Sequence, residues 1–144
     1  MEIILSSSDK YQKVVTLSKW TSDNGNVSHW VDIRTFWFKE EERLPTRKGV
    51  MLKLNEFEKI LPFLYYRNEC SDIITAKYIP LGPAKKDLFK ENRVIQTRKN
   101  EKNEYMMDII LKTLKKETCI SITYEEVLHL WGNKEYIRNF FENN

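Results

Sequence analysis

The feature that most constrains this chain is a pair of strand-like runs joined by a tight turn. Residues 12–20, QKVVTLSKW, alternate and are rich in β-branched side chains, which is typical of a β-strand. The run from Val27 to Lys39 has the same character. Between them, SDNGN contains Asn24-Gly25, a strong signal for a hairpin turn. The sequence therefore predicts an antiparallel hairpin in its first half.

The second of these runs has two different faces, neither of them purely polar. Side chains of a strand alternate between its faces, so the pattern separates one set, Val31, Ile33, Thr35 and Trp37, from another, Trp30, Asp32, Arg34, Phe36 and Phe38. The second set mixes aromatic rings with a cation and is a candidate binding platform. Asp32 is expected to pair with a neighbouring cation. Alternation alone places Trp37 in the core, unless a bulge near the strand end brings it to the surface.

A helix is expected to follow this sheet. Residues 40–49 have the composition of a charged connection, with Pro45 setting a turn and Gly49 free to adopt a positive φ. After a short strand at 50–54, Asn55 and Glu58 have the spacing of a capping box. The apolar stripe of the helix would consist of Phe57, Ile60, Leu61 and Leu64, with Pro62 kinking or shortening it.

The same order of elements recurs in the second half. Strands are expected at 93–99, 104–114 and 119–122, and Thr123 and Glu126 form a second capping box before a helix that carries Val127, Leu128, Leu130 and Trp131. WVDI at 30–33 parallels MMDI at 106–109. We expect an α+β chain in which an antiparallel sheet followed by a helix is duplicated. The predicted units are 1–68 and 88–144, joined by a linker at 69–87.

Composition limits the class of function. The 144 residues, 41% of them hydrophobic, suit one domain or two small units sharing a core. A net charge of +3, with Glu40 to Glu42 close to the basic residues, requires any polyanion-binding charge to be local.

Two cysteines and two histidines show no zinc spacing, and no acid or histidine cluster suggests catalysis, so no cofactor, metal or enzymatic activity is expected. Free buried thiols are favoured, with a Cys70–Cys119 disulfide left open. The N-terminus resembles neither a signal peptide nor a membrane anchor, which predicts an intracellular protein without membrane contact.

Three ordered motifs point to a known family. They are VDIRTFW at 31–37, LPTRKGVMLKL at 44–54 and NEFEKI at 55–60. Through them, residues 10–66 resemble the transcriptional positive-cofactor-four family of single-stranded DNA-binding coactivators. The resemblance implies a curved four-stranded antiparallel sheet followed by a helix. It also implies two such units paired through their helices, with the sheets forming channels for single strands.

The resemblance also implies a binding surface. The family's strand cation and the aromatic residue after it correspond to Arg34 and Trp37, its earlier aromatic to Trp20, and its paired cations to Arg47 and Lys48, with Lys13 a looser match. The hairpin loop TSDNGNVSH is longer here, and Thr35 stands where the family often has an acid. The full predicted DNA-binding set is Lys13, Lys19, Trp20, Arg34, Phe36, Trp37, Arg47, Lys48 and Gly49, with secondary phosphate contacts at Arg93, Arg98 and Lys99.

The expected function is therefore non-catalytic binding of single-stranded DNA in transcription, replication or repair, with RNA and melted duplex left open as ligands. Stacking on aromatic rings contributes about 1–3 kcal/mol per base, and Arg and Lys follow the phosphates. Expected partners are proteins of the transcription machinery, and the expected location is the nucleus or an intracellular site of viral DNA synthesis and transcription. The two halves would form an internal pseudo-dimer with one strong binding face; a further homodimer stays open. The alternative is a protein-docking module that uses Tyr65-Tyr66 and Phe140-Phe141.

Overall fold

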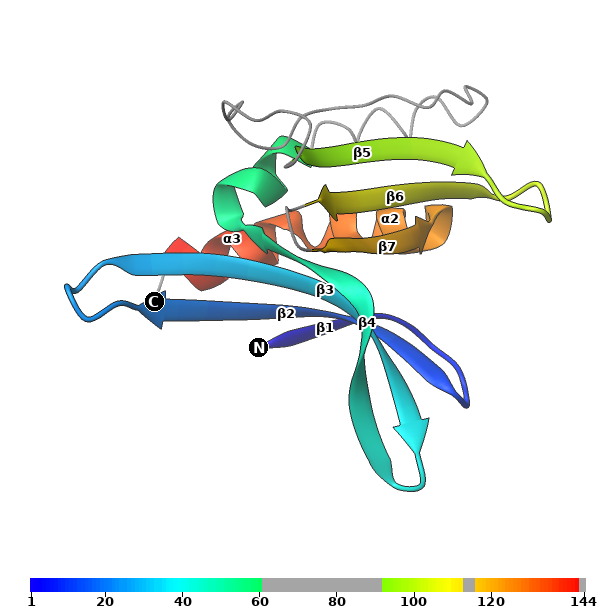
Figure 1. Ribbon diagram of the computed structural model, residues 1–144, viewed down its shortest axis with the longest axis horizontal. Helices are drawn as coiled ribbons and strands as arrows, with labels where there is room; N and C mark the ends of the chain where they lie inside the picture. The colour runs from blue at the N-terminus through cyan, green and yellow to red at the C-terminus, as the bar shows by residue number, and fades with distance from the viewer. Residues whose placement is uncertain (61–91, 113–115, 143–144) are drawn as a thin grey trace.

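The chain forms an α+β structure in which two antiparallel sheets share one core (Figure 1). The computed structural model describes residues 1–60, 92–112 and 116–142, and of residues 92–96 it describes the backbone only. The expected linker at 69–87, the helical residues Leu61, Pro62 and Leu64, and the proposed Tyr65-Tyr66 surface lie outside the described residues. No described helix has the length and apolar character needed to cross a membrane.

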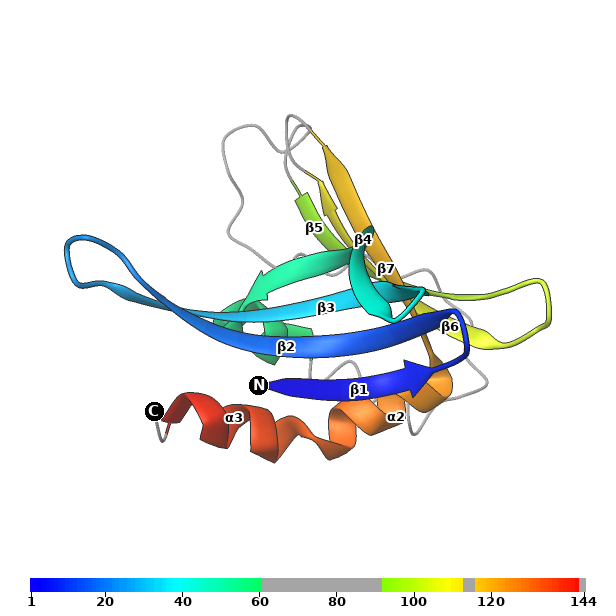
Figure 2. The same ribbon diagram turned by 90° about the horizontal axis from the view of Figure 1, so that it is seen from below.

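The first sheet has four strands in the order β1-β2-β3-β4, all antiparallel. They are β1 (Glu2–Ser7), β2 (Tyr11–Thr21), β3 (Val27–Lys39) and β4 (Glu42–Lys53). The hairpin predicted from Asn24-Gly25 joins β2 to β3, and Gly25 has a φ of +87°. The alternation pattern did not predict β1, although the family resemblance implied a fourth strand. Figure 2 shows β1 at the side of the sheet nearest α2 and α3.

One segment differs from the sequence-based expectation. Residues 42–49, predicted as a connection, belong to β4. The register against β3 jumps between Arg34 and Phe36, because Arg34 pairs with Gly49 while Phe36 pairs with Pro45. Three β4 residues, 46–48, therefore stand opposite Thr35 alone, which makes a large bulge. Gly49 has no positive φ; it is required because an added Cβ would lie 2.8 Å from two carbon atoms of the Arg34 side chain.

The second sheet has three strands in the order β5-β6-β7. These are β5 (Asn92–Lys99), β6 (Tyr105–Lys112) and β7 (Glu117–Thr123), followed by α2 (Tyr124–Gly132) and α3 (Lys134–Glu142). The sequence located all three strands but not α3, which is a separate helix. Phe141 on α3 is buried and stacks on His29 with ring centroids 4.8 Å apart. Phe140-Phe141 is therefore not the open docking surface of the alternative hypothesis: Phe140 is half-buried and contacts Phe141 edge-on.

Both sheets lead into helices, and both helix starts use a glutamate that reaches back to the chain. At α2 the predicted capping box is confirmed: Thr123 caps the helix and its amide donates to Glu126 Oε1 at 2.9 Å. The first helix contains residues 54–60, and there the predicted box of Asn55 and Glu58 is wrong. The amide of Lys53 donates instead to Glu56 Oε1 at 3.2 Å, so the cap lies two residues earlier than the pattern indicated.

The strand registers align the two halves residue by residue. Asp32 pairs across with Thr16 and Met51, and Asp108 pairs with Gln96 and Ser121. This makes β2-β3-β4 the counterpart of β5-β6-β7, and it aligns WVDI with MMDI as the sequence predicted. The equivalent core positions are Val31 and Met107, Ile33 and Ile109, Val50 and Ile120, Leu52 and Ile122, Phe57 and Val127, and Ile60 and Leu130, all of them buried. The structure is thus consistent with a duplicated arrangement.

A single hydrophobic cluster connects the two halves. It contains the core positions named above from both sheets and both helix starts, together with Ile3, Leu5, Val15, Leu17, Ile137 and Phe141. Over residues 1–60, 92–112 and 116–142, the buried apolar side chains of both sheets belong to this one cluster, so each sheet buries its apolar face against the other half. The face of each sheet that belongs to this cluster is called its core face below, and the opposite face its outer face.

Candidate nucleic-acid interface

A groove with a volume of about 920 Å³ lies where the end of the first sheet meets the second sheet. The first half supplies residues from the end of β1 and the turn after it, from the neighbouring ends of β2 and β3, and from the bulge in β4. The second half supplies residues of β6 and β7. The lining residues are Ser6, Ser7, Ser8, Tyr11, Gln12, Lys13, Thr35, Trp37, Thr46, Arg47, Lys48, Met106, Cys119, Ile120 and Ser121.

Trp37 and Tyr11 form the aromatic part of this groove. They are cross-strand partners in β3 and β2, so their side chains share one face of the sheet. That face is the core face, as alternation predicted for Trp37, but the pair lies beyond the end of the hydrophobic cluster. Trp37 is 39% exposed and Tyr11 is 52% exposed. The Lys39 ammonium lies 5.9 Å from the Trp37 ring centroid, so a cation already accompanies the ring.

Arg47 and Lys48 are brought to the groove by the bulge in β4. Both side chains are exposed. Thr46 fixes the bulge, because its hydroxyl donates to the Thr35 carbonyl at 2.6 Å and accepts from the Lys48 amide at 3.2 Å. Arg47 and Lys48, which the sequence placed in a turn, thus belong to a strand whose bulge is held by the Thr46 hydrogen bonds. Trp37 lines the same groove.

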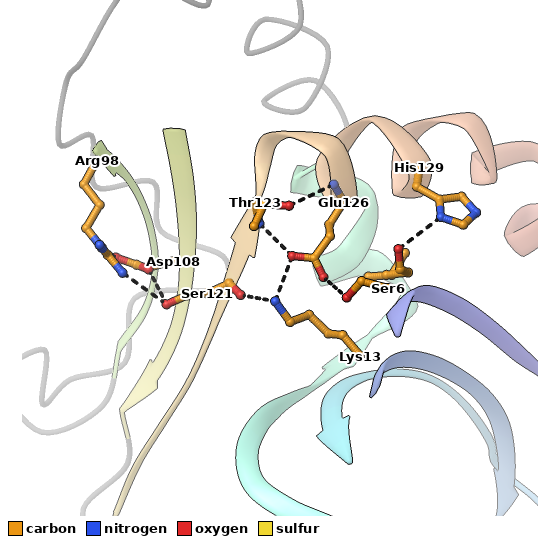
Figure 3. Close-up of polar contacts among 9 residues, drawn as sticks. Ser6, Lys13, Arg98, Asp108, Ser121, Thr123, Glu126 and His129 are labelled. Carbon is orange, nitrogen blue, oxygen red and sulfur yellow. Dashed lines mark hydrogen bonds and ion pairs between the residues drawn. The ribbon is translucent and has the colours of Figure 1, made fainter. Parts of the chain in front are cut away.

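Lys13 lines the groove but its charge is already used within the protein (Figure 3). Its ammonium donates to Glu126 Oε1 at 2.8 Å and to the carbonyl of Ser121 at 2.7 Å. The Ser6 hydroxyl donates to the other oxygen of Glu126 at 2.7 Å. Lys13 therefore ties β2 of the first half to β7 and α2 of the second.

The Glu126 carboxylate is kept ionised in this position. Burial alone would raise its pKa, but the hydrogen bonds from Lys13, the Thr123 amide and Ser6 outweigh burial, so the pKa is lowered. Its exposed side-chain fraction is 5%, compared with 17% for Lys13. The pair is a largely buried connection between the two halves.

The outer face of the first sheet holds a different part of the predicted set. Arg34 binds Asp32 through two nitrogens, each at 3.1 Å, and donates to the Thr46 carbonyl at 2.8 Å. The expected pairing of Asp32 with a cation is confirmed. Phe36, on the same face, is covered by the Arg43 guanidinium at 4.6 Å from the ring centroid. Trp20 is 61% exposed near the far end of β2.

The structure therefore divides the predicted residues between two places. Trp37, Arg47 and Lys48 meet in the groove with Lys13, whereas Trp20, Arg34 and Phe36 do not line it. Lys19 lies elsewhere on the core face, with its ammonium 5.6 Å from the Phe140 ring centroid.

The secondary cations lie in the second half. Arg98 Nε donates to Asp108 at 2.7 Å, and this hydrogen bond raises the pKa of Arg98. The Lys99 ammonium lies 5.0 Å from the Tyr105 ring centroid. Arg93 belongs to β5, but its side chain is outside the described part of the structure.

The second half repeats only part of the predicted binding set: the counterparts of Lys13 and Lys19 are Arg93 and Lys99, but other positions differ. By the strand register, the counterparts of Arg34 and Trp20 are Ile110 and Asn100. The counterparts of Arg47 and Lys48, counted back from the Met51–Ser121 equivalence, are Glu117 and Thr118. The bulge that would carry the cations is also absent from the β6–β7 pairing over residues 106–112 and 117–123.

Several groove residues escaped the sequence-based prediction. Tyr11 is adjacent in sequence to the strand expected at 12–20, and its register opposite Trp37 was the only signal that could have identified it. Met106, Cys119 and Ser121 come from the other half, and no local pattern connects them to Trp37. Among the described residues, no group of three or more histidines, cysteines and acids is placed to hold a metal ion.

Comparison with known protein families finds a match to the first half of the chain. Residues 8–62 match the family model described as Transcriptional Coactivator p15 (PC4). The matched segment runs from the β1–β2 turn through β2, β3 and β4 into the first helix, and so contains Tyr11, Trp37, Arg47 and Lys48. It confirms the resemblance seen over residues 10–66. No curated protein and no solved structure matches the chain.

Proposed function

We propose that this protein is a non-catalytic single-stranded DNA-binding protein of the coactivator type, and that it holds the strand in the groove between its two sheets. The observation that carries the proposal is the meeting of Trp37 and Tyr11 with Arg47 and Lys48 in one groove. All four residues belong to the segment matched by the coactivator family model.

This arrangement suits an unpaired strand. Bases of a single strand expose their faces, and stacking on aromatic rings is worth about 1–3 kcal/mol per base whatever the base is. In a duplex those faces are already stacked. Arg47 and Lys48 can follow the phosphates, which adds a salt-dependent contribution without sequence preference. The groove therefore favours single strands and does not distinguish sequences.

Two carboxylates that contact groove residues are neutralised within the protein. Glu126 is bound by Lys13, Ser6 and Thr123. Asp108 accepts from Arg98 and from the Ser121 hydroxyl, the latter at 2.6 Å. Arg47 and Lys48 are exposed and line the groove, so their charge acts locally although the whole chain carries a net charge of only +3.

The proposal includes how the protein is used. One chain supplies both halves of the groove, so a monomer is the expected binding unit, with further self-association left to measurement. The expected partners beyond DNA are proteins of the transcription machinery, in the nucleus or at an intracellular site of viral DNA synthesis and transcription. A role in replication or repair would use the same site.

The direct test is fluorescence anisotropy with labelled oligo(dT) and with a duplex of equal length. We expect the wild type to prefer oligo(dT) and Arg47→Ala/Lys48→Ala to bind it more weakly. Loss of two phosphate contacts should make the slope of log affinity against log salt shallower by about 1.4. The matched control, Lys102→Ala/Arg138→Ala, removes one lysine and one arginine from exposed positions away from the groove. An equal loss of oligo(dT) affinity in Arg47→Ala/Lys48→Ala and in the control variant would reject a local binding site.

A pair of tryptophan variants decides which face is used. Trp37→Ala removes the groove ring and should weaken binding about tenfold or more. Trp20→Ala removes the exposed ring of the outer face and should change affinity little. The opposite result would move the site to the outer face with Arg34 and Phe36. No preference of the wild type for single strands would reject the proposed function.

A further inference from the structure

We infer that the second half, although it has no counterparts of Arg47 and Lys48, supplies the apolar wall of the groove against which the bases lie, through Met106 and Cys119. This inference rests on the proposed function and assigns an orientation to the strand: phosphates toward Arg47 and Lys48, base edges toward β6 and β7. The ligand is therefore a strand whose bases are free to enter a gap between sheets.

The position of the wall follows from the register of the second sheet. Met106 and Cys119 lie on its outer face, the same face as Asp108 and Ser121, while Met107 and Ile120 point to the core. Met106 and Cys119 both line the groove and both are half-buried. They are thus covered on one side by protein and remain accessible from the groove.

The wall is suited to bases because its acid is removed from the surface. Asp108 is buried, and its two oxygens accept from Arg98 at 2.7 Å and from Ser121 at 2.6 Å. Burial, followed by the nearby charge of Asp108, raises the pKa of the Cys119 thiol, which keeps Cys119 neutral near pH 7. A thioether and a neutral thiol are soft apolar contacts for aromatic rings.

Comparison with the equivalent positions of the first half shows that the wall is particular to this side. The counterparts of Met106 and Cys119 are Trp30 and Gly49. The Arg34 side chain fills the space over Gly49, and Trp30 is accompanied by the Lys53 ammonium at 5.9 Å. The first half thus covers this position with a cation, whereas in the second half the cation beside Met106, its cross-strand partner Arg98, is held by Asp108 and Ser121.

Two methionine variants test the wall. Met106→Glu places a charged side chain among the expected base contacts, and Met51→Glu makes the same change at an exposed methionine on the outer face of the first sheet, outside the groove. Binding of oligo(dT) should fall at least tenfold for Met106→Glu and less than threefold for Met51→Glu. Met106→Ala, which adds no charge, should also weaken binding by several-fold, whereas Met51→Ala should not.

Cys119 provides a second readout that leaves every groove residue unchanged. In a Cys70→Ser background, Cys119 is the one remaining thiol. Its reaction with a maleimide, followed at about pH 8.5 because its pKa is raised, should slow at least fivefold when oligo(dT) saturates the protein. A duplex at the same concentration should protect it much less.

The outcomes separate the wall from the proposed function. If Trp37→Ala weakens binding while Met106→Glu binds as wild type and Cys119 is not protected, the strand uses the first half alone and the wall is wrong. If wild type does not bind oligo(dT), both proposals fall. Protection of Cys119 together with selective loss in Met106→Glu supports the wall.

Discussion

The connection between the two halves can be tested by removing Glu126. Glu126→Ala deletes the hydrogen bond to the Thr123 amide, a helix-cap contact of about 1 kcal/mol. It also leaves the Lys13 ammonium hydrogen-bonded to the Ser121 carbonyl, at 2.7 Å, without its carboxylate partner. Removing one member of a buried ion pair costs about 3–5 kcal/mol. Because Lys13 is 17% exposed and keeps that carbonyl, we expect the low end, about 3 kcal/mol of unfolding free energy.

The expected pH dependence follows from the lowered pKa of Glu126. A carboxyl group whose folded pKa lies below its unfolded value stabilises the fold above the unfolded value, and that contribution is lost as the pH falls through the folded pKa. The ordinary value here is 4.5. The difference in unfolding free energy between wild type and Glu126→Gln should therefore have its full value near pH 7. It should shrink as the pH is lowered below 4.5. Other carboxylates titrate equally in both proteins and cancel.

Urea unfolding followed by tryptophan fluorescence and by circular dichroism measures both effects. The matched control is Glu125→Ala, an exposed acid in the same first turn of α2, which should cost less than about 0.5 kcal/mol. A cost for Glu126→Ala below about 1 kcal/mol, or a difference from Glu126→Gln that does not change with pH, would show that the pair does not hold the halves together.

Two further substitutions test packing. Gly49→Ala should lower the free energy of unfolding by about 1–3 kcal/mol, because the new Cβ would lie 2.8 Å from Arg34. Adding Arg34→Ala should recover part of this loss. The control is Gly132→Ala, whose new Cβ meets nothing within 4 Å and which should be nearly neutral in the same urea titration. Phe141→Ala should lower the free energy of unfolding by about 3 kcal/mol, because Phe141 belongs to the shared core and stacks on His29. The variant should still unfold in one cooperative transition. Separate transitions for the two halves would contradict a single core.

Local patterns predicted the elements well where one periodicity governs a segment. The alternation in Val27–Lys39 predicted the whole of β3 and the faces of its residues, because successive side chains of a strand must point to opposite sides. Asn24-Gly25 predicted the hairpin, and Thr123-x-x-Glu126 predicted the start of α2, because both depend on contacts within a few residues. The repeat of WVDI as MMDI identified the equivalence of the two halves.

The same reasoning failed where a partner distant in sequence decides the structure. Gly49 appeared to be a turn residue, but it lies in β4 and makes room for the Arg34 side chain from the neighbouring strand. Asn55 and Glu58 had the spacing of a capping box, yet Glu56 makes the contact, since the strand before the helix sets where the helix begins. Spacing alone does not contain this information.

The sequence by itself supplied the candidates for a nucleic-acid site, among them the rings of Trp20, Phe36 and Trp37 and the cations Arg34, Arg47 and Lys48. The tertiary structure decided which of them meet. It placed Trp37, Arg47 and Lys48 in one groove and Arg34 and Phe36 on the other face, and it bound Lys13 to a glutamate 113 residues away. The physical reason is that strand and helix periods arise from neighbouring residues, whereas a groove between two sheets exists only after both have buried their apolar faces in a shared core.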